Sequence, residues 1–152
     1  MKYISDLTSF VVVLLLVWLS FDSLLPSKAT LATAPDTEFS AQRALVPLVE
    51  IANAPHYHGT DEHTRVRGFI VSELEKLGLQ TQLQEAFVLS NNNKRLVRPN
   101  NIVARLKGTG TGKSLVLLSH YDSALVPSFG ASDAGSGVAT ILESLRAYNA
   151  SG

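Results

Sequence analysis

The chain has 152 residues, and its 13 basic residues balance its 13 acidic ones, so the formal net charge at pH 7 is zero. A balanced charge creates no overall field that would attract nucleic acid or an anionic membrane surface, and we expect no nucleic-acid partner. The absence of cysteine excludes disulfide bonds and thiolate metal ligands. After an apolar N-terminal segment, the remaining length corresponds to about one small domain.

The N-terminal segment is typical of membrane targeting. Residues 10–19 are almost wholly aliphatic, and Lys2 precedes them. A membrane-spanning helix needs about 20 apolar residues, whereas the core of a signal peptide needs about 7 to 15. We interpret residues 1–25 as a membrane anchor or a signal segment, and the small residues at 32–34 offer a possible cleavage pattern. In either case we expect the rest of the chain to lie outside the cytoplasm.

Two helices are predicted after a linker at residues 26–39. Ser40 is a favourable N-cap for an apolar-rich helix that continues through Ile51 despite an internal proline. A second helix is predicted over residues 62–77, with Gly78 as its C-cap. Its apolar side chains recur on one face at Val66, Phe69, Ile70, Leu74 and Leu77.

Three strands are predicted in the second half of the chain. Residues 81–88 alternate as a strand does, and the three asparagines at 91–93 indicate a turn. Residues 101–106 and 114–119 are expected to pair with each other across the glycine-rich turn at 108–112. The continuous apolar run within 114–119 indicates a strand that is buried on both faces, because such a strand need not alternate.

A histidine and a carboxylate follow this apolar run. Successive side chains of a strand point to opposite faces, so His120 and Asp122 share a face with Cα atoms about 7 Å apart. A ligating imidazole needs its second nitrogen engaged, or its tautomer and direction are not defined. We therefore expect His120 to bind a metal and Asp122 to orient the His120 ring.

A second candidate ligand, Asp133, lies in a glycine-rich loop before a helix predicted over residues 135–148. Glycines at 130, 135 and 137 allow the backbone to turn tightly and to approach a metal or substrate closely. An isolated carboxylate at this place would otherwise be an ordinary helix N-cap. Two ligands cannot complete a zinc shell, which usually takes at least three protein ligands.

The motifs around these residues closely resemble one family. Residues 119–146 contain His-Tyr-Asp-Ser and Gly-Ala-Ser-Asp-Ala-Gly-Ser-Gly-Val-Ala, and they resemble the di-zinc aminopeptidases of the aminopeptidase Y and vacuolar membrane protease type. Upstream, residues 55–60, 66–70 and 100–104 resemble segments of the membrane-anchored members. The resemblance covers residues 40–148. It implies an α/β fold of three αβα layers around a mixed central sheet.

The resemblance also implies roles for the site residues. His120 would bind one zinc ion, Asp133 would bridge two Zn²⁺ ions, and Asp122 would hold His120. The substrates would be peptide or protein N-termini, hydrolysed by a metal-activated water. The family further uses an adjacent Glu-Glu pair, another acidic ligand and a second histidine, which do not occur after Asp133 here. Ala134 also departs from the Asp or Asn common at that place.

We therefore expect residues 40–152 to be the N-terminal part of a zinc peptidase domain, inactive by itself. The membrane-anchored members favour an uncleaved anchor for residues 1–25, with secretion after signal cleavage as the alternative. Two functional alternatives stay open: a non-catalytic relative that acts as an interaction or receptor domain, and a glutaminyl cyclase with a single zinc.

Other motifs are rejected. Residues 108–114 resemble a phosphate-binding loop, but their glycines are too close together and a strand, not a helix, is predicted to follow. Residues 130–134 resemble a serine-hydrolase elbow that lacks its last glycine. The histidines at 56, 58 and 63 have irregular spacing and a loop setting, which predict a solvated turn and not a zinc cluster.

Overall fold

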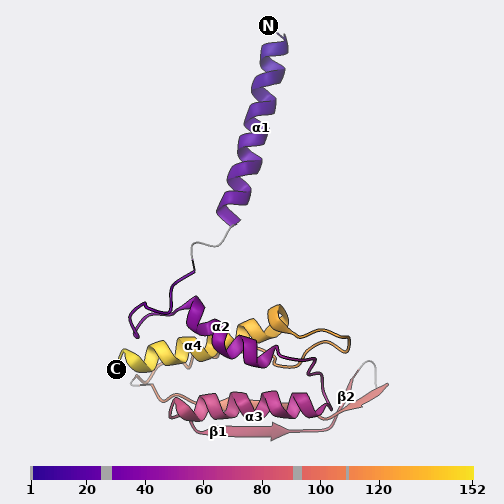
Figure 1. Cartoon of the computed structure of the whole chain (residues 1–152), viewed down its shortest axis with the longest axis vertical. Coiled ribbons are helices and arrows are strands. Elements are labelled where there is room, and N and C mark those ends of the chain that lie inside the picture. The colour runs from indigo at the N-terminus through magenta and orange to yellow at the C-terminus, as the bar shows by residue number, and fades with distance from the viewer. Residues whose placement is uncertain (1, 25–28, 91–93, 109) are drawn as a thin grey trace.

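The structure is a computed structural model that describes residues 2–24, 29–90, 94–108 and 110–152. Its elements in chain order are α1 (Lys2–Leu24), α2 (Ala41–Ile51), α3 (Asp61–Lys76), β1 (Thr81–Glu85), β2 (Val88–Ser90), β3 (Arg95–Val97), β4 (Asn100–Ala104), the wide turn η1 (Ala131–Gly135) and α4 (Ser136–Ala150). Helices α2, α3 and α4 form one body with two small two-stranded sheets, and α1 extends away from it (Figure 1).

Helix α1 is apolar and exposed along its length. Its segment Asp6–Leu24 has 19 residues, a mean hydropathy of 2.1 and no burial against the rest of the protein. At about 1.5 Å per residue, such a helix is close to the ~30 Å hydrocarbon thickness of a bilayer. It is therefore long and apolar enough to cross a membrane, and a signal sequence would meet the same criteria.

Helices α2 and α3 begin at side-chain caps. The Ser40 hydroxyl accepts a hydrogen bond from the backbone N–H of Arg43 at 3.2 Å, which confirms the predicted start of α2. Thr60 caps α3 in the same way, accepting from the N–H of His63 at 3.1 Å, so α3 starts one residue earlier than predicted. An N-cap of this kind satisfies one of the helix's otherwise unpaired donors.

The end of α3 is close to the predicted one. Leu77 is the C-cap, and Gly78 follows it with φ +77, a left-handed conformation that glycine adopts without strain. The N–H of Leu79 bonds to the carbonyl oxygen of Leu74 at 3.1 Å and closes the turn. The predicted apolar face is confirmed: three of its residues are buried, Val66, Ile70 and Leu74.

The strands pair differently from the prediction. β1 pairs antiparallel with β4, with Leu83 opposite Ile102, and β2 pairs antiparallel with β3. The predicted strand 81–88 is thus two strands, and β3 was not predicted. The expected turn at residues 91–93 lies outside the described residues. The predicted pairing of 101–106 with 114–119 is wrong, because β4 takes β1 as its partner.

The prediction of a buried strand at 114–119 is also wrong. This segment has no regular secondary structure, and its apolar side chains are exposed: Leu115 is 86% exposed and Leu118 is 91% exposed. A strand requires a neighbour whose backbone pairs with its own N–H and C=O groups. No strand among the described residues pairs with this segment, so hydrophobicity alone does not produce a strand here.

The core lies between the three body helices and the β1–β4 sheet. Its buried members come from α2, α3, α4 and the turn after α3: Ile51, Val66, Ile70, Leu74, Leu79, Val138 and Leu142. Helix α2 packs against α4, and α3 packs against both β1 and β4. Helix α4 corresponds to the helix predicted over residues 135–148 and is confirmed, as is the α/β class.

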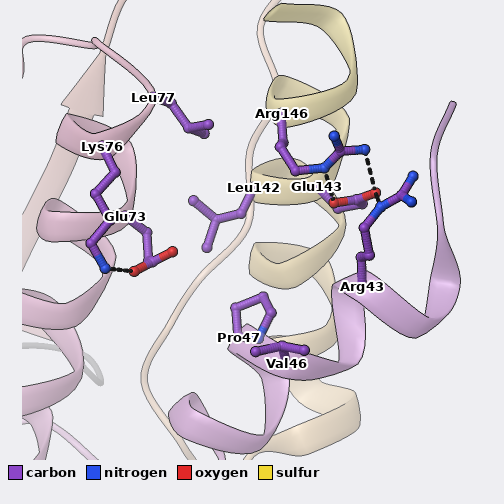
Figure 2. A pocket seen from close by; sticks show the side chains of 9 residues that line it. All are labelled: Arg43, Val46, Pro47, Glu73, Lys76, Leu77, Leu142, Glu143 and Arg146. Atoms are coloured by element: carbon purple, nitrogen blue, oxygen red, sulfur yellow. Dashed lines mark hydrogen bonds and ion pairs between the residues drawn. The ribbon is translucent and has the colours of Figure 1, made fainter. Parts of the chain in front are cut away.

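A buried carboxylate joins α2 to α4. Glu143 is 4% exposed, and it accepts hydrogen bonds from the backbone N–H of Ser40 at 2.9 Å and from Arg43 Nε at 3.0 Å. Arg146 Nε donates to the same carboxylate at 2.7 Å (Figure 2). Burial alone would raise the pKa of Glu143, but the hydrogen bonds from Arg146, Ser40 and Arg43 outweigh it, and the pKa is lowered. Glu143 is therefore a structural ion-pair partner.

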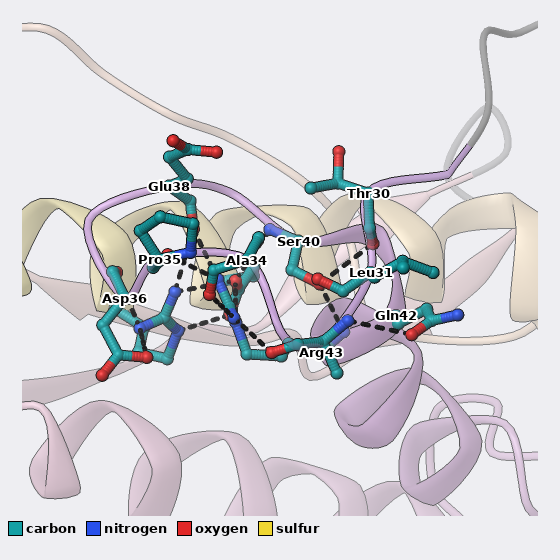
Figure 3. Close-up of polar contacts among 12 residues, drawn as sticks. Thr30, Leu31, Ala34, Pro35, Asp36, Glu38, Ser40, Gln42 and Arg43 are labelled. Carbon is teal, nitrogen blue, oxygen red and sulfur yellow. Dashed lines mark hydrogen bonds and ion pairs between the residues drawn. The ribbon is translucent and has the colours of Figure 1, made fainter.

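The same arginines hold the segment that precedes α2. Arg43 donates to the carbonyl oxygens of Ala32 at 2.7 Å and Glu38 at 2.7 Å, and Ser40 Oγ donates to that of Leu31 at 2.9 Å (Figure 3). Arg146 donates to the carbonyl oxygen of Asp36 at 2.9 Å. The segment that the sequence suggested as a linker is thus bound to the body from about residue 30 onward.

Candidate metal centre

The structure brings His120 and Asp133 together. His120 lies in the irregular segment after β4, and Asp133 lies in η1, immediately before α4. His120 Nε2 is 2.9 Å from Asp133 Oδ1. Two donor atoms at this separation can contact one zinc ion, because zinc–ligand distances are about 2.0 to 2.2 Å. Both side chains are open to solvent, at 52% and 87% exposure.

Asp122 engages the other nitrogen of the His120 ring. Nδ1 is 3.2 Å from the backbone oxygen of Asp122 and 3.3 Å from its Oδ1. With Nδ1 donating to these oxygens, Nε2 is the nitrogen that faces Asp133. Burial alone would lower the pKa of His120, but the hydrogen bonds to Asp133 and Asp122 outweigh it, and the pKa is raised.

Glycine allows the loop that carries Asp133 to pack closely. A Cβ at Gly137 would lie 2.5 Å from Ser119 Oγ and 3.2 Å from Ser119 Cβ, so Ser119 would have to shift to admit a side chain in this first turn of α4. Ser119 Oγ donates to the carbonyl oxygen of Ala134 at 3.2 Å, beside Asp133. The segment before His120 is thereby joined to the segment after Asp133.

Asp133 is not an ordinary helix cap. Helix α4 begins at Ser136 with no side-chain cap, and Asp133 has extended backbone angles, φ −126 and ψ 91. The peptide bond between Asp133 and Ala134 is cis. The Asp133 carboxylate points at His120 and does not accept a capping hydrogen bond from the N–H groups of α4. The N-cap alternative for Asp133 is therefore wrong.

The three histidines upstream do not form a solvated turn. His56 is 1% exposed and His63 is 3% exposed, while the His58 side chain is 39% exposed. Burial lowers the pKa of His63 to about 4, so His63 is neutral at pH 7. The spacing of the histidines in the sequence could not reveal their burial, because a segment distant in sequence covers them. The N–H of Ser123, in that segment, donates to the carbonyl oxygen of His56 at 3.3 Å.

The residues present fit part of a metal site. An imidazole nitrogen and a carboxylate oxygen are donors that zinc prefers, and the second imidazole nitrogen is engaged as a ligating histidine requires. Across residues 2–24, 29–90, 94–108 and 110–152, no group of three or more His, Cys, Asp or Glu side chains is placed to hold a metal ion. His120 and Asp133 therefore provide two donor atoms of the kinds that zinc prefers, fewer than the three or four protein ligands that a zinc shell takes.

The fold is that of zinc exopeptidases and glutaminyl cyclases. The structure is similar to a glutaminyl cyclase from Porphyromonas gingivalis, with a TM-score of 0.67 and 30% identity over 76% of this chain and 41% of that one. It is also similar to a Zn-dependent exopeptidase from Parabacteroides distasonis, with a TM-score of 0.64 and 25% identity over 77% of this chain and 43% of that one. The expected fold class is confirmed.

The sequence comparisons identify the family. Residues 101–152, which contain the candidate metal centre, match the model described as Peptidase family M28. The vacuolar membrane protease of Candida tropicalis is 30% identical over 91% of this chain, and that of Schizosaccharomyces japonicus is 33% identical over 70%. The family match and these relatives support the peptidase family that the motifs predicted. The chain spans 16% and 14% of the length of these curated relatives.

Proposed function

We propose that this chain supplies the first two ligands of a zinc aminopeptidase site, with the remaining ligands and the general base contributed by further sequence of the same protein. The observation that carries the proposal is the 2.9 Å approach of His120 Nε2 to Asp133 Oδ1, with His120 Nδ1 engaged by Asp122. Membership of a peptidase family and the likeness to a Zn-dependent exopeptidase support it.

Each residue has a distinct task in this proposal. His120 Nε2 and the Asp133 carboxylate would hold zinc, with Asp133 offering a ligand to each of two ions, and Asp122 would fix the His120 ring. Zinc held by these residues would supply a bound water with a pKa of about 7 and would polarise the scissile carbonyl. Glu143 does not serve as a base, because its buried carboxylate is taken up by Ser40, Arg43 and Arg146.

We further propose the domain organisation expected from the sequence. Residues 1–25 anchor the protein in a membrane, residues 26–39 connect to the body, and residues 40–152 begin an extracytoplasmic zinc peptidase domain. The exposed apolar helix α1 and the vacuolar membrane proteases among the relatives support anchoring. Secretion after signal cleavage is the alternative.

Glutaminyl cyclase activity with one zinc ion is the second candidate, favoured by the likeness to the Porphyromonas gingivalis enzyme. A non-catalytic receptor role is the third, since a fold does not guarantee chemistry. Substrate choice separates the three: an aminopeptidase releases a free N-terminal residue, a cyclase forms a lactam from N-terminal glutamine, and a receptor domain does neither.

The test uses the full-length protein that contains this chain, with a chromogenic amide of an N-terminal amino acid as substrate. We expect chelator-sensitive release, abolished by His120→Ala or Asp133→Ala. Asp122→Ala should lose less, about 10- to 100-fold, because it removes an orienting group and no ligand. The 152-residue chain alone should neither turn over nor bind zinc tightly. Zinc-dependent turnover by this chain alone, or full activity of His120→Ala, would contradict the proposal.

A further inference from the structure

The Asp122 carboxylate has a second neighbour that the sequence did not indicate. Its Oδ1 lies 3.3 Å from His120 Nδ1, and its Oδ2 lies 3.3 Å from His58 Nε2. One carboxylate therefore stands between two imidazoles that come from segments far apart in the sequence. The Asp122 side chain is 31% exposed, so water reaches it only in part.

His58 is itself held by a column of rings. The His63 ring meets the His58 ring edge-on, with centroids 4.9 Å apart, and stacks on the Tyr121 ring at 4.8 Å. The Tyr121 hydroxyl donates to the carbonyl oxygen of Asn100 in β4 at 2.7 Å. The column thus runs from the sheet through α3 to His58, and its inner ring, His63, is buried and neutral.

The backbone of the His58 loop is fixed to the segment that carries Asp122. The N–H of His56 donates to Ser123 Oγ at 2.9 Å, and the N–H of Ser123 donates to the carbonyl oxygen of His56 at 3.3 Å. These two bonds lie within two residues of His58 on one side and within one residue of Asp122 on the other. The loop and the site segment therefore behave as one packed unit.

We propose that His58 is a positioning residue for the metal centre: it holds one oxygen of Asp122 so that the other stays on His120 Nδ1. A carboxylate with one oxygen unheld can rotate about its last side-chain bond and withdraw Oδ1 from the imidazole, which then keeps only the backbone oxygen of Asp122 at 3.2 Å. Held on both sides, it keeps the His120 ring aimed at Asp133. This inference rests on the proposed function, because it assigns a task within that same site.

The experiment compares three forms of position 58 in the full-length protein. His58→Phe keeps a ring against His63 and removes the donor. His58→Gln replaces Nε2 by an amide N–H at a similar distance from the backbone. Asp61→Asn, an exposed position in the first turn of α3, is the matched control. Zinc affinity is measured by competition with a chromophoric chelator, kcat and KM with the chromogenic amide, and folding by circular dichroism.

We expect His58→Phe to weaken zinc binding about 10-fold and to lower kcat by a similar factor with KM little changed, near the lower end of losses for groups that orient ligands. His58→Gln should recover to within about threefold of the parent, and Asp61→Asn should match the parent. If His58→Phe does not fold, His58→Ala makes the same comparison against His58→Gln.

A double-mutant cycle decides whether His58 acts through Asp122. In an Asp122→Asn background, adding His58→Phe should change zinc affinity less than about twofold, because the carboxylate it positions is already gone. Additive losses, unchanged zinc affinity in His58→Phe, or His58→Gln as weak as His58→Phe would each overturn the inference. A parent protein that neither binds zinc nor hydrolyses the amide would instead refute the proposed function.

Discussion

Glu143 should contribute more to stability than any exposed ion pair, and Glu143→Gln tests this. The substitution keeps the volume of the side chain and removes its charge. The parent carboxylate accepts from Ser40 N–H at 2.9 Å, Arg43 Nε at 3.0 Å and Arg146 Nε at 2.7 Å. Its side chain is 3% exposed, whereas those of Arg43 and Arg146 are 17% and 28% exposed.

These exposures define the size of the effect. Breaking a buried ion pair costs about 3 to 5 kcal/mol, because the remaining charge is left uncompensated. Both arginines retain some access to water, so we expect the lower end, about 3 kcal/mol. The control is Glu73→Gln, which removes an i,i+3 pair with the exposed Lys76 (Figure 2). Pairs of that kind contribute about 0.3 to 0.5 kcal/mol.

Urea denaturation followed by circular dichroism measures both changes. The pKa of Glu143 in the folded state is lowered from 4.5, so the folded state binds fewer protons than the unfolded state. The charged Glu143 therefore stabilises the folded protein above that pH. This stabilisation is lost as the pH falls through the lowered value. The difference between parent and Glu143→Gln should therefore be largest near pH 7 and should shrink in acid. A loss below about 1 kcal/mol at pH 7, or a difference independent of pH, would refute the reasoning.

Two further substitutions test other parts of the structure. His63→Phe keeps the ring stack on Tyr121 and removes Nε2, which is buried and has no hydrogen-bond partner among the described residues. We expect a stability within about 1 kcal/mol of the parent or higher. The stability of His63→Phe should depend less on pH than that of the parent between pH 6.5 and about 4. The parent loses stability there as the pH falls, because His63 takes up a proton in the unfolded state but stays neutral in the folded state. Gly137→Ala forces a Cβ to within 2.5 Å of Ser119 Oγ, and a displaced loop should lower kcat/KM of the full-length protein by about 10- to 100-fold. Gly108→Ala, which meets no atom within 4 Å, is the control, and equal activities of the two variants would contradict this view of the loop.

Several features follow from the sequence alone because their causes are local. An N-cap serine satisfies a donor two or three residues ahead, so Ser40 predicted the start of α2. The start of α3 was predicted without its Thr60 cap and lies one residue earlier than expected. The apolar face of α3 follows from its 3.6-residue period. The motifs around His120 and Asp133 predicted the family, and the resemblance implied that these two side chains share one metal site.

Other features depend on contacts that no local pattern contains. The run 114–119 has the hydrophobicity of a buried strand, yet a strand exists only where another backbone pairs with it, and β4 pairs with β1. His63 is buried because Tyr121 stacks on it, and Glu143 is an ion-pair partner because α2 brings Arg43 beside α4. Hydrogen bonds and burial are properties of pairs of segments, and only the tertiary structure decides which segments meet.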